Sequence, residues 1–130
     1  MKLSLVSLDK SGFIQVACEG DITTRDFLDM NRNPLDATLG VSWPTMSVLM
    51  SMAKVTFVDS SAVGWLISCH KEAKKQGGQF VVHSPPPNVL QILDLLHLRT
   101  VLRVASSEEE GRAMIDAQSD AAGEAKTPAP

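Results

Sequence analysis

Short apolar runs alternate with longer stretches of helical periodicity along this chain. Residues 3–8 and 13–18 are rich in aliphatic and β-branched side chains, and the turn-forming residues 9–12 separate the two runs. This pattern predicts a β-hairpin with a four-residue loop. Gly20-Asp21 is expected to end the second strand of the hairpin, since glycine and aspartate are depleted in strands.

The segment after the hairpin predicts two short helices. Thr23 or Thr24 is placed to cap the first, because threonine side chains accept hydrogen bonds at helix starts. Its apolar side consists of Phe27, Leu28 and Met30. Pro34 favours the start of the second helix, and Gly40 is expected to close it.

The remainder of the chain alternates between strand and helix patterns. Nearly continuous apolar runs are typical of strands covered on both faces, and they occur at 46–52 (extended by 55–58), 79–83 and 100–104. Apolar spacings of three and four residues, with terminating glycines and prolines, predict helices between these runs. The first of these helices is expected over 59–76, and the second carries apolar residues at 89, 92, 93 and 96. The last is expected to run through Ile115, with a capping box formed by Ser106 and Glu109 or by Ser107 and Glu110.

The expected element order is therefore β-β-α-β-α-β-α-β-α. An initial hairpin followed by strand–helix alternation predicts a single α/β domain with a mixed, mostly parallel sheet of about five strands and about four helices. We expect this domain to occupy residues 1–117. Residues 118–130 are mainly Ala, Pro and small polar residues, which predicts a disordered C-terminal tail.

Composition narrows the function classes. The 130 residues carry a formal net charge of −3, and 44% of them are hydrophobic. This mild acidity argues against a direct nucleic-acid binder, which would normally carry a basic patch. No apolar run reaches the roughly 20 residues of a membrane helix, and the serine-interrupted N-terminus is a poor signal peptide. Two widely spaced cysteines predict neither a disulfide framework nor a zinc site, so we expect a cytoplasmic protein without a metal or other cofactor.

The segment around residues 55–66 carries the most information about function. A buried strand leads directly to Asp59, Ser60 and Ser61, which are placed at the start of a helix. At 100° per residue, the core-facing arc of that helix holds Ala62, Val63, Leu66, Cys69, His70 and Ala73. The opposite arc is small and polar near its N-terminal end.

Gly64 and Trp65 each allow two interpretations. A glycine inside a helix costs about 1 kcal/mol relative to alanine, so Gly64, beside Ser61 and Ser68, indicates either a surface that a partner approaches closely or packing under a neighbouring loop. Trp65 lies at the boundary of the buried arc. It is either a binding anchor at the rim of that surface or a core residue.

These residues resemble a known family. The run Phe-Val-Asp-Ser-Ser-Ala-Val-Gly at 57–64 is similar to the signature of the STAS domain, specifically of bacterial anti-sigma factor antagonists. Gly-Asp-Ile at 20–22, Gly-Gly-Gln-Phe-Val-Val at 77–82 and the segment 89–102 resemble further family segments. The resemblance spans roughly residues 3–116. The chain departs from the usual pattern where Ala62 stands in place of a glycine.

The resemblance implies a phosphorylation switch. It implies Ser60 as the phosphoacceptor of an anti-sigma factor that is also a serine kinase, and a phosphatase that reverses the modification. The unphosphorylated form would bind the anti-sigma factor and release the sigma factor. The partner-binding surface implied by the resemblance and the helix pattern consists of Asp21, Asp59, Ser61, Gly64, Trp65 and Ser68. We expect a phosphate on Ser60 to be tolerated by the fold, because helix starts offer free amides and a positive dipole end.

Two further function classes stay open. One is a STAS subunit without phosphorylation, which serves as an accessory of a transporter or as a signalling scaffold. The other is a sensor of a small ligand such as a nucleotide or lipid. An enzyme is not expected, because a serine nucleophile needs a base within hydrogen-bond reach. Of the three histidines, His70 lies about two and a half turns from Ser60 on the apolar arc, and His83 and His97 lie in other elements.

Overall fold

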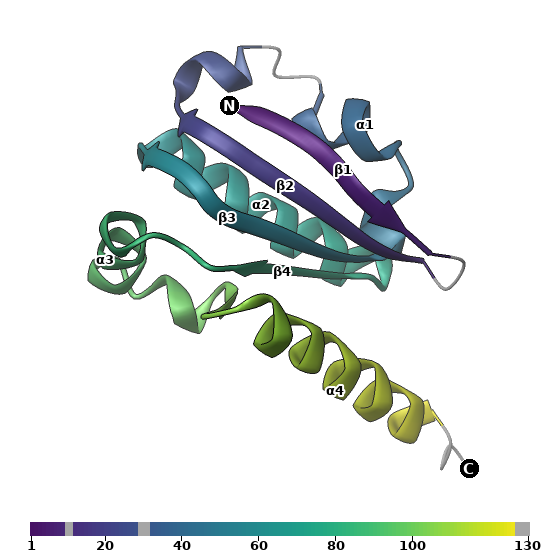
Figure 1. The fold of residues 1–130 in the computed structure, drawn as a ribbon. Coiled ribbons are helices and arrows are strands. Elements are labelled where there is room, and N and C mark those ends of the chain that lie inside the picture. Colours follow the sequence, from purple (N-terminus) through teal and green to yellow (C-terminus); the bar gives the residue numbers. More distant parts are fainter. Residues whose placement is uncertain (10–11, 29–31, 127–130) are drawn as a thin grey trace.

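The computed structural model describes residues 1–9, 12–28 and 32–126, with only the backbone described for 118–126. Its centre is a five-stranded sheet in the order β1-β2-β3-β4-β5 (Figure 1). The strands are β1 (Lys2–Leu8), β2 (Phe13–Ile22), β3 (Ser47–Val58), β4 (Gln79–His83) and β5 (Arg103–Ala105). Only the β1–β2 hairpin is antiparallel; the other neighbouring pairs are parallel. The expected mixed, mostly parallel sheet is thereby confirmed.

Helices connect the strands and cover both faces of the sheet. They are α1 (Pro34–Leu39), α2 (Ser60–Gln76), α3 (Pro87–Leu95) and α4 (Glu108–Lys126). Figure 1 shows α2 running along one face, while α4 runs along β4 on the other side. The element order is the one that the sequence pattern predicts, and Gly77 ends α2 in the left-handed conformation that favours glycine.

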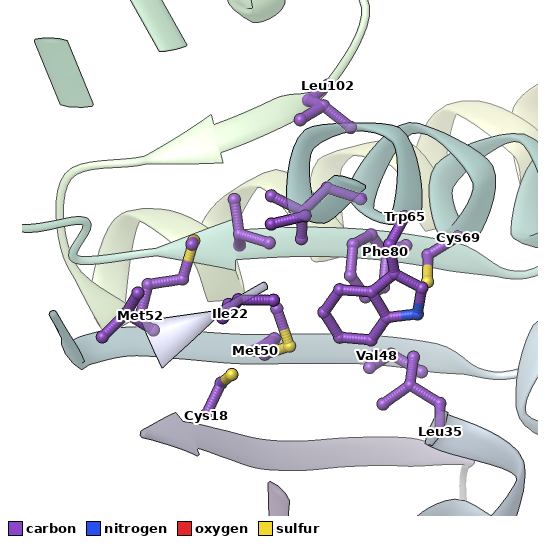
Figure 2. Close-up of a cluster of buried hydrophobic side chains, with 14 of the residues drawn as sticks. Cys18, Ile22, Leu35, Val48, Met50, Met52, Trp65, Cys69, Phe80 and Leu102 are labelled. Carbon is purple, nitrogen blue, oxygen red and sulfur yellow. The ribbon is translucent and has the colours of Figure 1, made fainter. Parts of the chain in front are cut away.

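The apolar run of β3 is buried on both faces, as predicted. Val48, Met50 and Met52 point into the main core between the sheet and α2, which Figure 2 shows in close-up. Leu49 points the other way, into a smaller cluster with Val81 and with residues of α4. Because successive side chains of a strand point to opposite faces, one continuous apolar run supplies both cores.

Three boundaries differ from the sequence prediction around the hairpin and the last strand. β2 extends one residue beyond the expected end at Gly20-Asp21, because Ile22 still pairs with Val58 of β3. The first short helix is a single 3₁₀ turn, Thr24–Phe27, and Met30 lies outside the described residues. The last strand is shorter than the predicted 100–104, since a 3₁₀ turn at Leu98–Thr100 takes up the start of that segment.

The C-terminal helix is longer than predicted. We expected disorder from residue 118, whereas α4 continues to Lys126. Alanine has the highest helix propensity, and this segment is rich in it. The acidic first turn (Glu108, Glu109 and Glu110) also complements the helix dipole. Residues 127–130 of the expected tail lie outside the described residues.

Candidate functional site

The candidate site lies where β3 passes into α2. Asp59 has an extended backbone and caps α2, since its Oδ1 accepts a hydrogen bond from the Ala62 amide at 3.0 Å. This is the expected N-cap geometry, and it fixes the point at which the helix starts. Ser60 is therefore the first helical residue, and its side chain is exposed.

The other carboxylate oxygen of Asp59 binds the segment that follows β2. Thr24 donates its backbone N–H to Oδ2 of Asp59 at 2.9 Å, and its hydroxyl lies 3.3 Å from the same oxygen. The Thr24 hydroxyl also lies 2.9 Å from the hydroxyl of Ser61. Asp59, Thr24 and Ser61 thus form one hydrogen-bonded unit at the surface.

The hydrogen bonds to Asp59 determine its charge. The amide of Ala62 contributes most, and Thr24 adds to it, so the pKa of the Asp59 carboxyl is lower than usual despite some desolvation. The carboxylate is therefore ionised at neutral pH, directly beside Ser60. Hydrogen bonding to the charged form is a standard cause of such a shift.

Ser60 differs from the neighbouring hydroxyls in having no internal partner. Within the described residues, its hydroxyl makes no hydrogen bond, whereas that of Ser61 is held by Thr24. We expected free amides at the helix start to receive a phosphate on Ser60. The structure modifies this expectation, because Asp59 already occupies the Ala62 amide. A group attached to Ser60 would therefore meet the positive end of the helix but also an ionised carboxylate.

Asp21 lies near the end of β2, where it pairs with Phe57 of β3, close in the sequence to Asp59 and Ser60. The register of β2 and β3 shifts between Gly20 and Asp21, so that Thr56 is left without a partner in the ladder. Thr56 donates its hydroxyl to Oδ1 of Asp21, and its carbonyl accepts a hydrogen bond from the Asn88 side chain at 3.0 Å. A bulge of this kind re-aims side chains, and here it joins β2, β3 and the start of α3.

The exposed face of α2 continues this surface. Gly64 and Ser68 are both exposed, and they lie on the same side of the helix as Ser61. A Cβ added at Gly64 would meet no described atom within 4 Å, so no loop among the described residues packs on this glycine. Of its two interpretations, packing under a loop is therefore wrong, and the helix face remains open to approach.

Trp65 is not at the rim of this surface, and the prediction of an exposed anchor is wrong. Its side chain is only 6% exposed and belongs to the core. The ring of Phe27 packs against the Trp65 ring, with the two centroids 5.4 Å apart. The indole Nε1 of Trp65 donates a hydrogen bond to Oδ1 of Asn33 at 2.9 Å. Phe27 of the 3₁₀ turn and Asn33, which caps α1, thus cover Trp65. The core interpretation of Trp65 is confirmed (Figure 2).

Sequence reasoning missed four residues of the site: Thr24 as a side-chain partner, Thr56, Phe57 and Asn88. Phe57 is 47% exposed beside Asp59, an unusual exposure for a large apolar side chain at the end of a strand. Its place within the similar segment 57–64 was the one available signal. The contacts of Thr24 and Asn88 join residues more than 30 positions apart, so no local pattern predicts them.

No histidine in the described part of the chain hydrogen-bonds Ser60; His83 is buried and its Nδ1 lies 2.8 Å from the Ser84 hydroxyl. Among the described residues, no three or more His, Cys, Asp or Glu side chains are grouped so that they could hold a metal ion. No described helix is both long and apolar enough to cross a bilayer.

Comparison with known proteins identifies the family. The model of the STAS domain matches residues 11–111, so the chain belongs to the STAS domain family. The fold is the α/β STAS fold, with a mostly parallel five-stranded sheet and four helices.

Several solved structures share this fold at low sequence identity. An anti-sigma factor antagonist from Mycobacterium paratuberculosis superposes with a TM-score of 0.67 and 16% identity, over 88% of this chain and 95% of that one. The Bacillus anti-sigma factor antagonist SpoIIAA, in its unphosphorylated form, superposes with a TM-score of 0.66 and 16% identity, over 89% of this chain and 97% of that one. The murine anion transporter Slc26a9 superposes with a TM-score of 0.68 and 16% identity, over 88% of this chain but only 22% of the transporter. At these identities the likeness concerns the fold alone.

Proposed function

We propose that this chain is a non-enzymatic anti-sigma factor antagonist, switched by phosphorylation of Ser60. In its unphosphorylated form it binds an anti-sigma factor that is also a serine kinase. Phosphorylation by that kinase ends the interaction, and a phosphatase restores it. The single observation that carries the proposal is the exposed, unbonded hydroxyl of Ser60 at the first position of α2.

A kinase needs a hydroxyl that it can reach and deprotonate. Ser61 is half-buried and shares its hydroxyl with Thr24, so of the two adjacent serines Ser60 is the accessible one. Structures of SpoIIAA in unphosphorylated and phosphorylated forms supply the precedent for such a switch in a protein of this fold. The chemical consequence is charge, since a phosphoserine adds about −1.5 to −2 at neutral pH.

The docking surface we propose surrounds Ser60. It consists of Asp21, Asp59, Ser61, Gly64 and Ser68, with Phe57 and Thr24 added by the geometry. Asp21 and Asp59 make this surface acidic before any modification, which favours a partner that presents basic groups. A phosphate next to the ionised Asp59 then concentrates negative charge at one point and changes what can dock there.

The phosphoacceptor is tested by incubation with a serine-kinase anti-sigma factor of the source organism and ATP. We expect mass spectrometry to find one phosphate in the wild type, none in Ser60→Ala, and one in the matched control Ser42→Ala, which removes an exposed hydroxyl outside the docking surface. Undiminished phosphorylation of Ser60→Ala would show that another residue is the acceptor.

Binding is measured separately by titration calorimetry with the same partner. Ser60→Glu is expected to weaken binding by about a hundredfold, equivalent to about 3 kcal/mol, while Ser68→Glu weakens it less. A wild-type chain that neither binds nor accepts phosphate would contradict the proposed function. It would leave the unphosphorylated accessory subunit as the better explanation.

A further inference from the structure

The strand β1 forms one edge of the sheet and is unusually apolar for an exposed edge. Leu5, Val6 and Leu8 are 48%, 60% and 56% exposed, respectively. An edge strand also presents unpaired backbone N–H and C=O groups along its free side. Apolar side chains and free backbone groups therefore occur together on β1, at the upper edge of the sheet in Figure 1.

The usual protections of an edge strand are mostly missing from β1. Soluble proteins normally place charged residues or prolines on long edge strands, or make those strands short. Lys2 is the only charged residue of β1, and residues 3–8 contain neither a charged residue nor a proline. The opposite edge, β5, has only three residues, and Arg103 there is fixed by hydrogen bonds to Gln79 and to the Met114 carbonyl.

The one irregularity of β1 is a bulge that sets which side chains share a face. Leu5 pairs with Val16 and Ser7 pairs with Gln15, so Val6 is the extra residue. Beyond the bulge the alternation resumes with shifted parity. One face of β1 therefore holds Leu3, Leu5 and Leu8, and the other holds Lys2, Ser4 and Ser7.

This shifted alternation makes β1 complementary to itself. If two copies of β1 pair antiparallel about a two-fold axis at Leu5, Leu3 lies opposite Leu8, Ser4 lies opposite Ser7, and Leu5 meets its own copy. Lys2 then lies beside Asp9 of the second copy, twice across the axis. Apolar, polar and charged positions thus each meet their own complement, and same-face pairing is retained throughout, as sheet geometry requires.

We propose that β1 pairs antiparallel with β1 of a second copy of this chain, which joins the two sheets into one continuous sheet. The occupant is a second copy because the register is symmetric, and because Lys2 at the start of β1 and Asp9 directly after its end carry opposite charges. An ionised carboxylate offers about four acceptor sites, so the hydrogen bond from the Phe13 amide to Asp9 at 3.1 Å does not prevent this carboxylate from attracting the Lys2 ammonium of the second copy. α1 packs near β1, yet Leu5 and Leu8 remain about half exposed beside it.

The proposed pairing does not involve the site around Ser60. β2 separates β1 from β3, and Ser60 follows the C-terminal end of β3. A single strand pair buries less area than a stable interface, so the dimer is expected to be weak and concentration-dependent. The dimer does not depend on the proposed function, and each can fail without the other.

The register is tested by a symmetric disulfide. Leu5→Cys places two thiols opposite each other at the two-fold axis, at a Cα separation that suits a disulfide. The native Cys18 and Cys69 are buried and contribute little background. Under mild oxidation we expect Leu5→Cys to form a covalent dimer at least about tenfold faster than Val41→Cys, an exposed control away from β1. Equal rates would overturn the proposed register.

The dimer itself is tested by sedimentation velocity from micromolar to near-millimolar concentration. The wild type is expected to show reversible dimerisation, weakened about tenfold or more by Val6→Lys and about three- to tenfold by Lys2→Glu, which sets like charges beside Asp9. Leu96→Lys, another exposed leucine, is expected to change nothing. Circular dichroism reports folding; if Val6→Lys fails to fold, Lys2→Glu decides. A wild type that stays monomeric throughout, or a dimer unaffected by Lys2→Glu, would overturn the proposal.

Discussion

The backbone N–H of Thr24 donates to Oδ2 of Asp59 at 2.9 Å, and this bond joins the end of β2 to the start of α2. The two residues are 35 positions apart in the sequence. Through this contact, the residue that caps α2 also holds the loop that borders Ser60. The geometry of the site therefore depends on one carboxylate that accepts hydrogen bonds from two directions.

Asp59 makes the stability of the fold depend on pH. Its folded-state pKa is lowered, so its stabilising contribution is present above the unfolded-state pKa of about 3.9 and is lost as pH falls through the lower folded value. Asp59→Asn keeps a good capping side chain but cannot ionise. We expect urea unfolding between about pH 5 and pH 2 to show a smaller loss of stability in Asp59→Asn than in the wild type. Parallel curves for the two proteins would contradict this role.

A substitution at Gly64 is expected to change stability and partner binding in opposite directions. The space around it is open and its helix favours alanine, so Gly64→Ala is expected to raise the free energy of unfolding by up to about 1 kcal/mol. Under the proposed function the added methyl group weakens partner binding. The matched control is Gly78→Ala, whose Cβ would lie 2.3 Å from the Pro44 carbonyl oxygen and should destabilise the fold.

Urea denaturation and calorimetric titration with the partner measure the two effects separately. A stabilised Gly64→Ala variant with unchanged affinity would remove Gly64 from the docking surface. A destabilised variant would contradict the open environment of the glycine.

Local patterns were sufficient for the fold and for the position of Ser60. Alternation, helical spacing and terminating residues predicted every strand and helix in order, and an aspartate before two serines predicted where α2 begins. These signals depend on near neighbours in the chain. The long α4 was missed because low-complexity composition was taken as disorder, although alanine also favours helix.

The parts that failed depend on long-range packing. Helical periodicity put Trp65 on a boundary, and the side it faces is decided by Phe27 and Asn33, which come from another segment. Likewise, the exposure of Phe57 follows from the register shift between β2 and β3, which hydrophobic alternation does not contain.

Trp65 and Asn33 should be coupled energetically. Trp65→Ala is expected to cost about 3–5 kcal/mol because a large buried side chain is removed. Trp65→Phe keeps an aromatic ring but loses the hydrogen bond to Asn33, at a cost of about 1–2 kcal/mol. A double-mutant cycle of Trp65→Phe and Asn33→Ala should give a coupling energy of about 0.5–1.5 kcal/mol. If Trp65→Ala lowers the free energy of unfolding by no more than an ordinary surface substitution does, Trp65 is not in the core.

The two cysteines are expected to be unreactive in the folded state. Burial raises the pKa of both the Cys18 and the Cys69 thiol to about 12, and the thiolate is the reactive form. A colorimetric thiol reagent at mildly alkaline pH should label neither in native buffer and both in urea. Rapid labelling of one thiol in native buffer would reveal local opening of the core around it.

Phe57 is expected to contribute to docking rather than to stability. Its ring is 47% exposed at the end of β3, directly before the Val58–Asp59 step into α2. Because half of the ring is already in water, Phe57→Ala should cost less stability than the 3–5 kcal/mol of a buried phenylalanine, about 1 kcal/mol. Aromatic side chains at the centre of an interface often contribute 1–2 kcal/mol or more, so affinity for the partner should fall about five- to thirtyfold. The matched control is Val41→Ala, which removes exposed apolar surface away from Ser60 and should leave affinity unchanged. If both variants bind like the wild type, the partner contacts α2 without reaching the end of β3, and the docking surface is confined to the helix.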